Sequence, residues 1–388
     1  MAVVPELRRY PFTPFTGDLP GELLDMIETD PVSRVLLPDG EPAWLVLDYA
    51  NCCAVLADPR FARLPPGAVT PDRPRDLNMD GPAHAAVRRV GGRAFTGRRV
   101  ESYRPRIQAV VDELVDAMVA GPRPADLVAA LVAPLPVRVT CELLGVPAPD
   151  REQFEGWLAG LNSVLTYNSA EAAKGLWVYL SGQVAAKRAA PGDDLLSVWL
   201  EGQEEHGLTD QELVVLAMGL LRGGLEVNST AAGVRALFLH PEQMAELVRD
   251  PGKAPAAIDE ILRYTAVSSM FRVQVVTEDL VLGGVELRAG ERVMAIPWVA
   301  NRDPRIFPNP NEFDIDRTPT SPHLAFGYGP HFCLGTAVAR LQVELSITTL
   351  LRRLPGLAPA VPIDELPWRH DRINGGIESF PVVWRDDQ

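Results

Sequence analysis

Apolar residues recur at intervals of three and four along most of this chain, which predicts a mainly helical fold. In a few short stretches apolar and polar residues alternate instead, and Gly283-Gly284 between two of these stretches indicates a tight hairpin. The helical pattern covers 104–119, 134–144, 151–161, 170–189, 209–239, 254–264 and 336–351, and the strand pattern covers 43–47, 280–282, 285–287 and 292–296.

The pattern shows no internal repeat and no linker between domains. The proline- and arginine-rich stretch 64–75 reads as a loop that is too short to separate two domains. A length of 388 residues would by itself suit two or three domains. Without a boundary, we expect a single domain over 1–388.

Composition and charge narrow the class of protein. Hydrophobic residues make up 47% of the chain, which is ample for a large core, and charged residues 23%. The net charge of −14 argues against nucleic acid or anionic lipid as the main partner. No apolar stretch reaches the ~18 residues of a membrane helix, and 1–10 lacks the apolar core of a signal peptide. We expect a cytoplasmic protein with no membrane partner.

Three of the four cysteines carry no functional pattern. Cys52 and Cys53 are adjacent and Cys141 is solitary, so their spacing fits neither a zinc site nor a redox pair. We expect them to be free thiols in a reducing compartment.

The fourth cysteine lies in a distinctive loop. Residues 326–335 read Phe-Gly-Tyr-Gly-Pro-His-Phe-Cys-Leu-Gly, and a helical pattern begins at Thr336. A helix start offers unpaired N–H groups and a partial positive charge, which stabilise a thiolate at Cys333. The glycines leave room for a large flat group close to the backbone. A thiolate presented in this way is suited to ligate haem iron.

This loop matches the pattern Phe-Gly-x-Gly-x-His-x-Cys-x-Gly of the cytochrome P450 family, and the order of elements resembles that family over nearly the whole chain. The resemblance implies a mainly α fold with small β-sheets, in which haem lies between a long central helix and the cysteine loop. It implies haem b (iron protoporphyrin IX) as the cofactor and Cys333 as the iron ligand. Phe326, Gly327, Gly335 and, on the long helix, Gly224 would lie next to the cofactor.

The same resemblance suggests partners for the two haem propionates, whose burial requires cationic or hydrogen-bonding groups. His84 and Arg88 fit the family element His-x-x-x-Arg, at i and i+4 on one helix face. Arg272 matches a third partner, and His331 in the cysteine loop a fourth.

A second family landmark is the pattern Glu-x-x-Arg, here Glu260 and Arg263, which are neighbours on a helix at i and i+3. Arg317 resembles the third member of the family's ion network, and it follows the family-like segment 300–304, Ala-Asn-Arg-Asp-Pro. We expect a buried structural network that is costly to break by removing one member.

The long helical run 209–239 departs from the family at one position. It opens with a capping box, Thr209 to Glu212, and contains Gly223-Gly224-Leu225-Glu226-Val227-Asn228. The family pattern is small-Gly-x-acid-Thr, so Val227 replaces a threonine whose hydroxyl helps deliver the protons that cleave the O–O bond. The resemblance places Glu226, Val227 and Asn228 at the catalytic centre. Asn228 lies ~100° further around the helix, so it is no direct substitute.

Three explanations for Val227 stay open. A water or a substrate hydroxyl completes the proton relay, or a substrate radical couples without oxygen insertion, or the enzyme accepts peroxide directly. The substitution Val227→Thr tests whether the missing hydroxyl limits the yield of product per electron.

By resemblance, the substrate pocket is lined by the middle of the long helix, the stretch after Glu-x-x-Arg and the C-terminal turn. A mixture of apolar and a few polar residues suits a medium-sized natural product such as an aromatic or cyclic peptide or a polyketide. The reaction expected is hydroxylation or oxidative C–C or C–N coupling. The candidate pocket residues are Leu221, Arg222, Leu225, Val267, Ser268, Ser269, Met270, Ile373, Asn374 and Ile377.

Electrons are expected from a ferredoxin and its reductase, because the chain contains no recognisable flavin or iron–sulfur module. A local basic group in this acidic chain would attract an acidic ferredoxin. A non-enzymatic haem-binding sensor or carrier is the alternative class, and steady NAD(P)H use with product formation would exclude it. The basic group consists of Arg88, Arg89, Arg93, Arg98 and Arg99.

Overall fold

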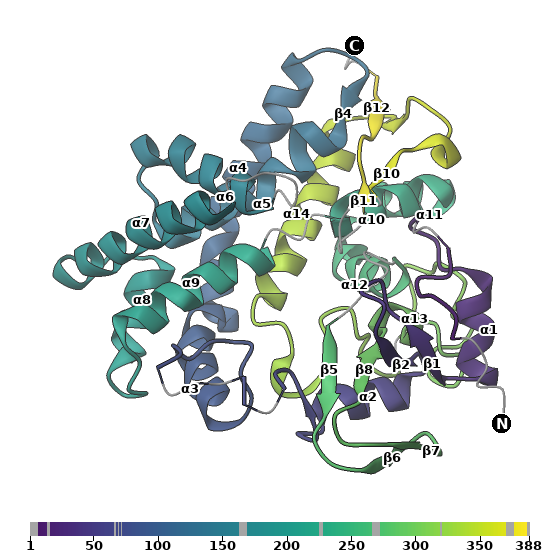
Figure 1. The fold of residues 1–388 in the computed structure, drawn as a ribbon. Helices are drawn as coiled ribbons and strands as arrows, with labels where there is room; N and C mark the ends of the chain where they lie inside the picture. The colour runs from purple at the N-terminus through teal and green to yellow at the C-terminus, as the bar shows by residue number, and fades with distance from the viewer. Residues whose placement is uncertain are drawn as a thin grey trace. The chain divides into compact units, whose positions relative to one another are not determined.

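The computed structural model describes residues 7–13, 16–65, 67–68, 70, 72–162, 169–224, 228–265, 272–318, 320–369 and 376–385. These residues form many helices and a few small sheets, as the hydrophobic pattern predicts (Figure 1). They fall into two compact units, each built from segments distant in the sequence. The single domain expected over 1–388 stays a prediction.

The first unit combines Met1–Val69, Asn228–Cys333 and Val361–Phe380. It contains a five-stranded sheet in the order β1-β2-β8-β5-β3, in which only the β2–β8 pair is parallel. Its helices are α1 (Gly21–Thr29), α2 (Tyr49–Ala57), α10 (Asn228–Leu239), α11 (Pro241–Arg249), α12 (Ala254–Tyr264) and α13 (Pro297–Ala300). Its strands are β1 (Val32–Leu36), β2 (Pro42–Val46), β3 (Phe61–Ala62), β5 (Val273–Val276), β6 (Leu280–Leu282), β7 (Val285–Leu287), β8 (Arg292–Ala295), β10 (Trp368–Arg369) and β11 (Gly376–Ile377).

Both faces of this sheet are buried. Along β2, Leu45 points to one face, where it packs in a cluster with residues of α1 and α13. Its neighbour Val46 points to the other face, where it packs with residues of α2. Because the side chains on both faces of the sheet are apolar, β2 and β8 each appear in the sequence as a short continuous run of apolar residues.

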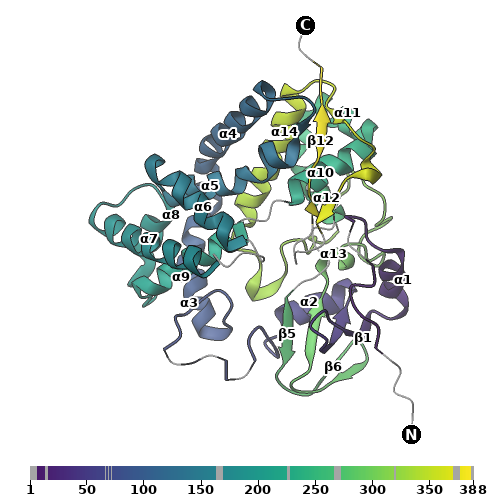
Figure 2. The same ribbon diagram turned by 45° about the horizontal axis from the view of Figure 1, so that its top comes forward.

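The second unit combines Thr70–Val227, Leu334–Ala360 and Pro381–Gln388. Within it, α4 and α14 lie side by side in both views, joined by an ion pair between Arg104 and Glu344 at 2.8 Å (Figures 1 and 2). Its helices are α3 (Gly81–Gly92), α4 (Gly97–Ala120), α5 (Pro134–Leu144), α6 (Arg151–Asn162), α7 (Ser169–Ala189), α8 (Leu195–Gln203), α9 (Asp210–Gly224) and α14 (Thr336–Arg353). The short strands β4 (Ala125–Asp126), β12 (Pro381–Val383) and β9 (Ala358–Pro359) form its sheet.

Most expected elements are confirmed to within a few residues. The Gly283-Gly284 hairpin is present as β6–β7, with φ of +56° and +85° at the two glycines. The run 209–239 appears as α9 and α10, and residues 225–227 between them lie outside the described part of the chain. One continuous helix over 209–239 therefore stays a prediction.

Candidate active site

Cys333 lies at the end of a loop that folds back on itself. The Cys333 N–H donates to the Phe326 carbonyl at 2.9 Å, and the Phe332 N–H donates to the Gly329 carbonyl at 3.0 Å. Cys333 is exposed. A Cβ placed on Gly327 or on Gly335 would meet no atom within 4 Å, so the backbone on either side of the cysteine is open to a flat ligand. The residues of this loop fit a haem group.

The other side of the loop rests on α2. A Cβ placed on Gly329 would lie 2.7 Å from the Leu56 carbonyl oxygen and 2.8 Å from the Ala57 Cα. The φ of Gly329 is +70°, a conformation that residues with a Cβ rarely adopt. Gly329 is therefore required for the approach to α2, whereas Gly327 faces open space.

In the second unit, α3 carries the first two expected propionate partners. His84 is buried, with 4% of its surface exposed, and Arg88 is half-buried one turn further along the same face. Near the end of α3, a Cβ on Gly91 would lie only 2.8 Å from Cδ2 of Leu334, the residue that follows Cys333. The Gly91 carbonyl also accepts a hydrogen bond from Trp199 Nε1 at 3.1 Å. The helix of His84 and Arg88 thus packs against the residue next to the candidate iron ligand.

In the first unit the two other expected partners lie on separate segments. Arg272 is exposed and directly precedes β5. His331 is half-buried at the end of a 3₁₀ turn, Gly329–His331, in the cysteine loop. That these two residues and α3 bind one cofactor stays a prediction.

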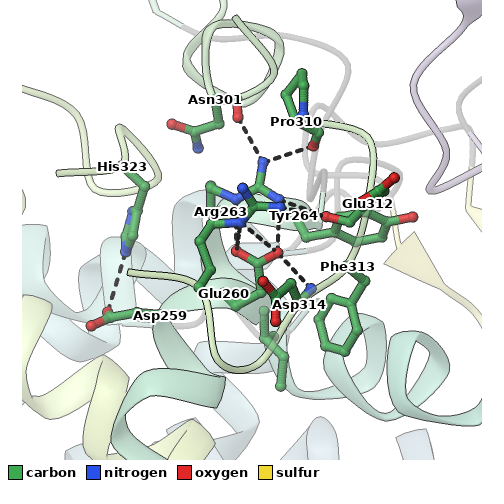
Figure 3. Close-up of polar contacts among 12 residues, drawn as sticks. Asp259, Glu260, Arg263, Tyr264, Asn301, Pro310, Glu312, Phe313, Asp314 and His323 are labelled. Atoms are coloured by element: carbon green, nitrogen blue, oxygen red, sulfur yellow. Dashed lines mark hydrogen bonds and ion pairs between the residues drawn. The ribbon is translucent and has the colours of Figure 1, made fainter. Parts of the chain in front are cut away.

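The predicted ion network is present, with side chains that are 2–10% exposed, and Figure 3 shows its members Glu260 and Arg263. Glu260 accepts from Arg263 Nε at 2.7 Å and from Arg263 Nη2 at 2.8 Å, and the two side chains are each 2% exposed. Arg317 Nε lies 3.1 Å from the same carboxylate, and the Asp314 N–H donates to it at 2.9 Å. The remaining guanidinium N–H groups of Arg263 donate to the carbonyls of Asn301, Pro310 and Glu312. The triad therefore fixes several loop backbones at once.

Asn301 connects this network to the cysteine loop. Its carbonyl accepts from Arg263 Nη1 at 2.9 Å, and its side-chain Oδ1 accepts from the Leu324 N–H at 2.6 Å. The Leu324 carbonyl in turn accepts from the Gly327 N–H at 2.9 Å. Asn301 is fully buried, and its Nδ2 has no hydrogen-bond partner in the described part of the chain. Leaving this amide nitrogen unpaired costs free energy, which the bond from Leu324 to Oδ1 partly offsets.

His323 forms a second link from α12 to the same loop (Figure 3). Its Nδ1 accepts from the Ala325 N–H at 3.3 Å, so the proton of the neutral ring lies on Nε2. Nε2 faces Asp259 Oδ1 at 3.4 Å, and Asp259 directly precedes Glu260 on α12.

Arg302 and Asp303 complete the segment. Burial lowers the pKa of Arg302 to about 10, and its guanidinium carbon lies 3.9 Å from the centre of the Tyr264 ring. Asp303 accepts from the Tyr49 N–H of α2 at 3.0 Å. The segment 300–304 therefore ties α12, α2 and the cysteine loop together.

The expected capping box at the start of α9 is confirmed. The Thr209 N–H donates to Glu212 Oε2 at 2.8 Å, and the Glu212 N–H donates to Thr209 Oγ1 at 3.2 Å. Arg75 adds a bidentate ion pair to Glu212 at 2.7 and 2.8 Å. Burial alone would raise the pKa of Glu212, but the bonds from Arg75 and from the Thr209 N–H outweigh it and lower the pKa to about 2. The loop before α3 is thereby fastened to α9.

Of the three catalytic candidates, Asn228 alone belongs to the described residues. Gly224 is the last residue of α9, and Glu226, Val227 and Leu225 lie outside the described residues. Asn228 is the first residue of α10 and is half-buried. The presence of Val227 where the family has a threonine is therefore known from the sequence alone.

The candidate pocket residues are described only in part. Leu221 is fully buried on α9, and Arg222 lies on the same helix. Ile377 on β11 is 3% exposed and pairs with Trp368 of β10. The other candidates, Val267, Ser268, Ser269, Met270, Ile373 and Asn374, lie outside the described residues.

Comparison with known proteins defines the class. The sequence model of the cytochrome P450 family matches residues 254–358, which include Glu260, Arg263 and Cys333. The mycinamicin IV hydroxylase/epoxidase of Micromonospora griseorubida is 41% identical over 397 residues, with 98% of this chain and 99% of that protein covered. The nocardicin C N-oxygenase of Nocardia uniformis subsp. tsuyamanensis is 39% identical, with 98% and 99% covered. The solved structure of the mixed-function P450 MycG matches with a TM-score of 0.91 at 39% identity, over 98% of this chain and all of that one.

The chain therefore belongs to the cytochrome P450 family. It is an enzyme, an oxidoreductase of the monooxygenase type, and the family implies a haem cofactor. The named activities of these relatives favour an enzyme over a sensor or carrier. In the described part of the chain, no helix is both long and apolar enough to span a membrane.

Sequence reasoning missed several residues that hold the site. Gly91 was one of many glycines, and only its neighbours in space show that a Cβ would not fit. Gly329 was expected, with Gly327 and Gly335, to leave room for a flat group, but the absence of its Cβ instead lets the loop approach α2. Asn301 lies in the segment 300–304 that the resemblance singled out, but its bond to Leu324 spans 23 residues. The fully buried position of an amide side chain is the signal that distinguishes it.

Proposed function

We propose that this cytochrome P450 oxidises a medium-sized natural product at a haem b whose iron is ligated by Cys333. The observation that carries the proposal is the cysteine loop, in which Cys333 is exposed and a Cβ on Gly327 or Gly335 would meet no atom within 4 Å. The loop packs on α2 at Gly329, and the side chain of Asn301 accepts a hydrogen bond from Leu324. A thiolate ligand donates electron density to the iron, and this favours O–O cleavage. The protein holds the thiolate in place and leaves the iron chemistry to the cofactor.

The two haem carboxylates are proposed to pair with His84 and Arg88 of α3 and with Arg272 and His331. Two observations support α3 in this role: His84 and Arg88 share one face, and the helix packs on Leu334 beside Cys333. Cationic and hydrogen-bonding groups lower the free-energy cost of burying the carboxylates. Phe326, Gly327, Gly335 and Gly224 are proposed to contact the ring.

The substrate is proposed to be a macrolide-type polyketide or a peptide-derived natural product. Support comes from the names of the relatives, a mycinamicin IV hydroxylase/epoxidase and a nocardicin C N-oxygenase. These names indicate hydroxylation, epoxidation or N-oxygenation, and with Val227 in place of a threonine, oxidative coupling stays an alternative outcome. Leu221 and Ile377 are proposed as the apolar walls of the pocket, because they are buried members of segments that the resemblance assigns to it.

Electrons are proposed to come from a ferredoxin that docks on Arg89 and Arg98. Within the predicted basic group, Arg93 is paired with Glu205 at 2.9 Å, and Arg99 lies 4.0 Å from Glu201. Arg89 and Arg98 are exposed, which leaves them as the attractive charges for an acidic partner. We also propose a cytoplasmic location, which the free thiols of Cys52 and Cys141 support.

Spectroscopy of the reduced protein with carbon monoxide tests the thiolate. The wild type is expected to show the red-shifted thiolate Soret band, and Cys333→Ala to lose it. The matched control Cys53→Ala, at a half-buried free cysteine, is expected to keep it. Absence of the band from the wild type would contradict the assignment of Cys333.

A substrate screen tests the reaction. Candidate macrolides and peptide-derived compounds are scored for a haem spin-state shift, and products of turnover with ferredoxin, reductase and NAD(P)H are identified by mass. One added oxygen indicates hydroxylation, epoxidation or N-oxygenation, and loss of two hydrogens or a dimer indicates desaturation or coupling. Binding without turnover would mean that the compound is a ligand of the pocket and not the substrate. Val227→Thr is assayed alongside for product formed per NAD(P)H consumed.

A further inference from the structure

The first residue of α10, Asn228, makes an unusually close approach to β11. A Cβ placed on Gly376 would lie 2.0 Å from Asn228 Oδ1, 2.5 Å from Cγ and 3.0 Å from Nδ2. The carboxamide therefore lies directly against the backbone of Gly376, in space that only a glycine leaves open. Both residues belong to the first unit.

Two further residues of α10, Arg235 and Phe238, make three more contacts within the first unit. Arg235 lies about two helical turns after Asn228 and therefore on the same side of the helix. Its guanidinium carbon is 5.8 Å from the centre of the Trp368 ring on β10, and it also forms an ion pair with Asp18 at 2.7 Å. Phe238 packs edge-to-face against Phe380, with ring centres 5.7 Å apart.

Between Asn228 and Arg235, α10 carries small residues at 229–233, and the buried Val234 follows them. Ala231 and Ala232 are buried at 2% and 9% exposure, and α10 contacts β11. Small residues allow backbones to approach closely, so the distance between α10 and β11 is set by the few larger groups. At the N-terminal end of α10, the larger group that lies against β11 is the carboxamide of Asn228.

We propose that Asn228 is a positioning residue that sets where β11 lies, and with it the pocket wall at Ile377. Ile377 is adjacent to Gly376, is 3% exposed and pairs with Trp368. This assignment rests on the proposed function, in which Ile377 lines the substrate pocket. Because its carboxamide lies against β11, Asn228 selects ligands by size.

Azole binding to the ferric holoenzyme tests this role. An azole nitrogen ligates haem iron, so imidazole reports access to the iron, while 4-phenylimidazole also reports the room beside it. Asn228→Ala and Gly376→Ala are each expected to change the Kd of 4-phenylimidazole about tenfold and the Kd of imidazole less than about twofold. Asn228→Asp, which keeps the shape of the side chain, is expected to bind both azoles as the wild type does.

A double substitution makes the test specific to the contact. In the double variant Asn228→Ala/Gly376→Ala, the Asn228 carboxamide that would clash with the new Cβ at position 376 is absent. The effects of the two substitutions on the Kd of 4-phenylimidazole are therefore expected not to add. Thermal unfolding is a second readout: Gly376→Ala is expected to lower the midpoint by roughly 2–6 °C in the wild-type background and by less in the Asn228→Ala background. The controls are Ser229→Ala on the next position of α10, and Gly21→Ala, where a Cβ meets no atom within 4 Å.

The outcomes separate this inference from the proposed function. If the wild type shows neither the carbon monoxide band nor an azole shift, the haem assignment itself fails. If both are normal but Asn228→Ala leaves the ratio of the two Kd values unchanged, or Ser229→Ala changes it equally, the positioning role is overturned. Additive effects in the double variant would also overturn it.

Discussion

The buried triad of Glu260, Arg263 and Arg317 leads to a quantitative prediction for Glu260→Gln. Glutamine keeps the volume of the side chain but removes the negative charge and turns one acceptor oxygen into a donor. One of the two Arg263 N–H groups now bonded at 2.7 and 2.8 Å would face that donor, and two guanidinium groups would lose their anion. Arg263 is only 2% exposed, so water cannot replace the lost partner.

Removing one partner of a buried ion pair costs about 3–5 kcal/mol, a large share of the roughly 5–15 kcal/mol of a typical domain. We therefore expect Glu260→Gln to lower the free energy of unfolding by about 3–5 kcal/mol. At an m-value of roughly 3 kcal/mol/M, the urea midpoint falls by about 1.0–1.7 M. The assay is urea unfolding of the holoenzyme, followed by far-UV circular dichroism.

Glu286→Gln is the matched control. Glu286 pairs with Arg288 at 2.6 Å, but the two side chains are 70% and 62% exposed. Such a surface pair contributes at most about 1 kcal/mol, so the midpoint should hardly move. The reasoning is refuted if Glu260→Gln costs less than about 1 kcal/mol, or no more than the control.

Three further predictions concern pH, loop position and electron transfer. Because the pKa of Glu212 is lowered to about 2 in the folded protein, against about 4.3 unfolded, its carboxylate contributes stability that is present above pH ~4.3 and is lost as the pH falls towards ~2. The difference in thermal midpoint between wild type and Glu212→Gln should thus be constant above pH ~6 and shrink below pH ~4.5, and a difference independent of pH would contradict this. Asn301→Leu leaves the buried Leu324 N–H without its acceptor and should cost about 1–3 kcal/mol in urea unfolding; a cost below about 0.5 kcal/mol would argue against the bond at 2.6 Å. Reversing the charge of both Arg89 and Arg98 to Glu should reduce ferredoxin-supported turnover at low salt by about tenfold and flatten its salt dependence, while dithionite reduction is unchanged. Arg288→Glu, in an exposed ion pair on β7–β8, is the control, and an equal loss there would reject the docking site.

Local chemistry allowed much of this protein to be predicted from its sequence. The helices 134–144 and 254–264 and the hairpin at Gly283-Gly284 are encoded by residues a few positions apart, and the structure confirms them. The capping box of Thr209 and Glu212 and the neighbouring pair Glu260 and Arg263 are likewise contacts within one helical turn. The cysteine loop matched its family at six fixed positions within ten consecutive residues, so it indicated the class of enzyme without knowledge of the fold.

The tertiary structure decided which distant residues meet. Arg75 reaches Glu212 across 137 positions, Asn301 holds Leu324 across 23, and Asn228 lies against Gly376. No periodicity records such pairs, because they depend on how the helices and strands pack, and packing is determined by the chain as a whole. The sequence alone therefore determined that Cys333 lies in a P450-type loop. Only the packed structure showed that Asn301 and Gly329 hold that loop and that the carboxamide of Asn228 lies against β11.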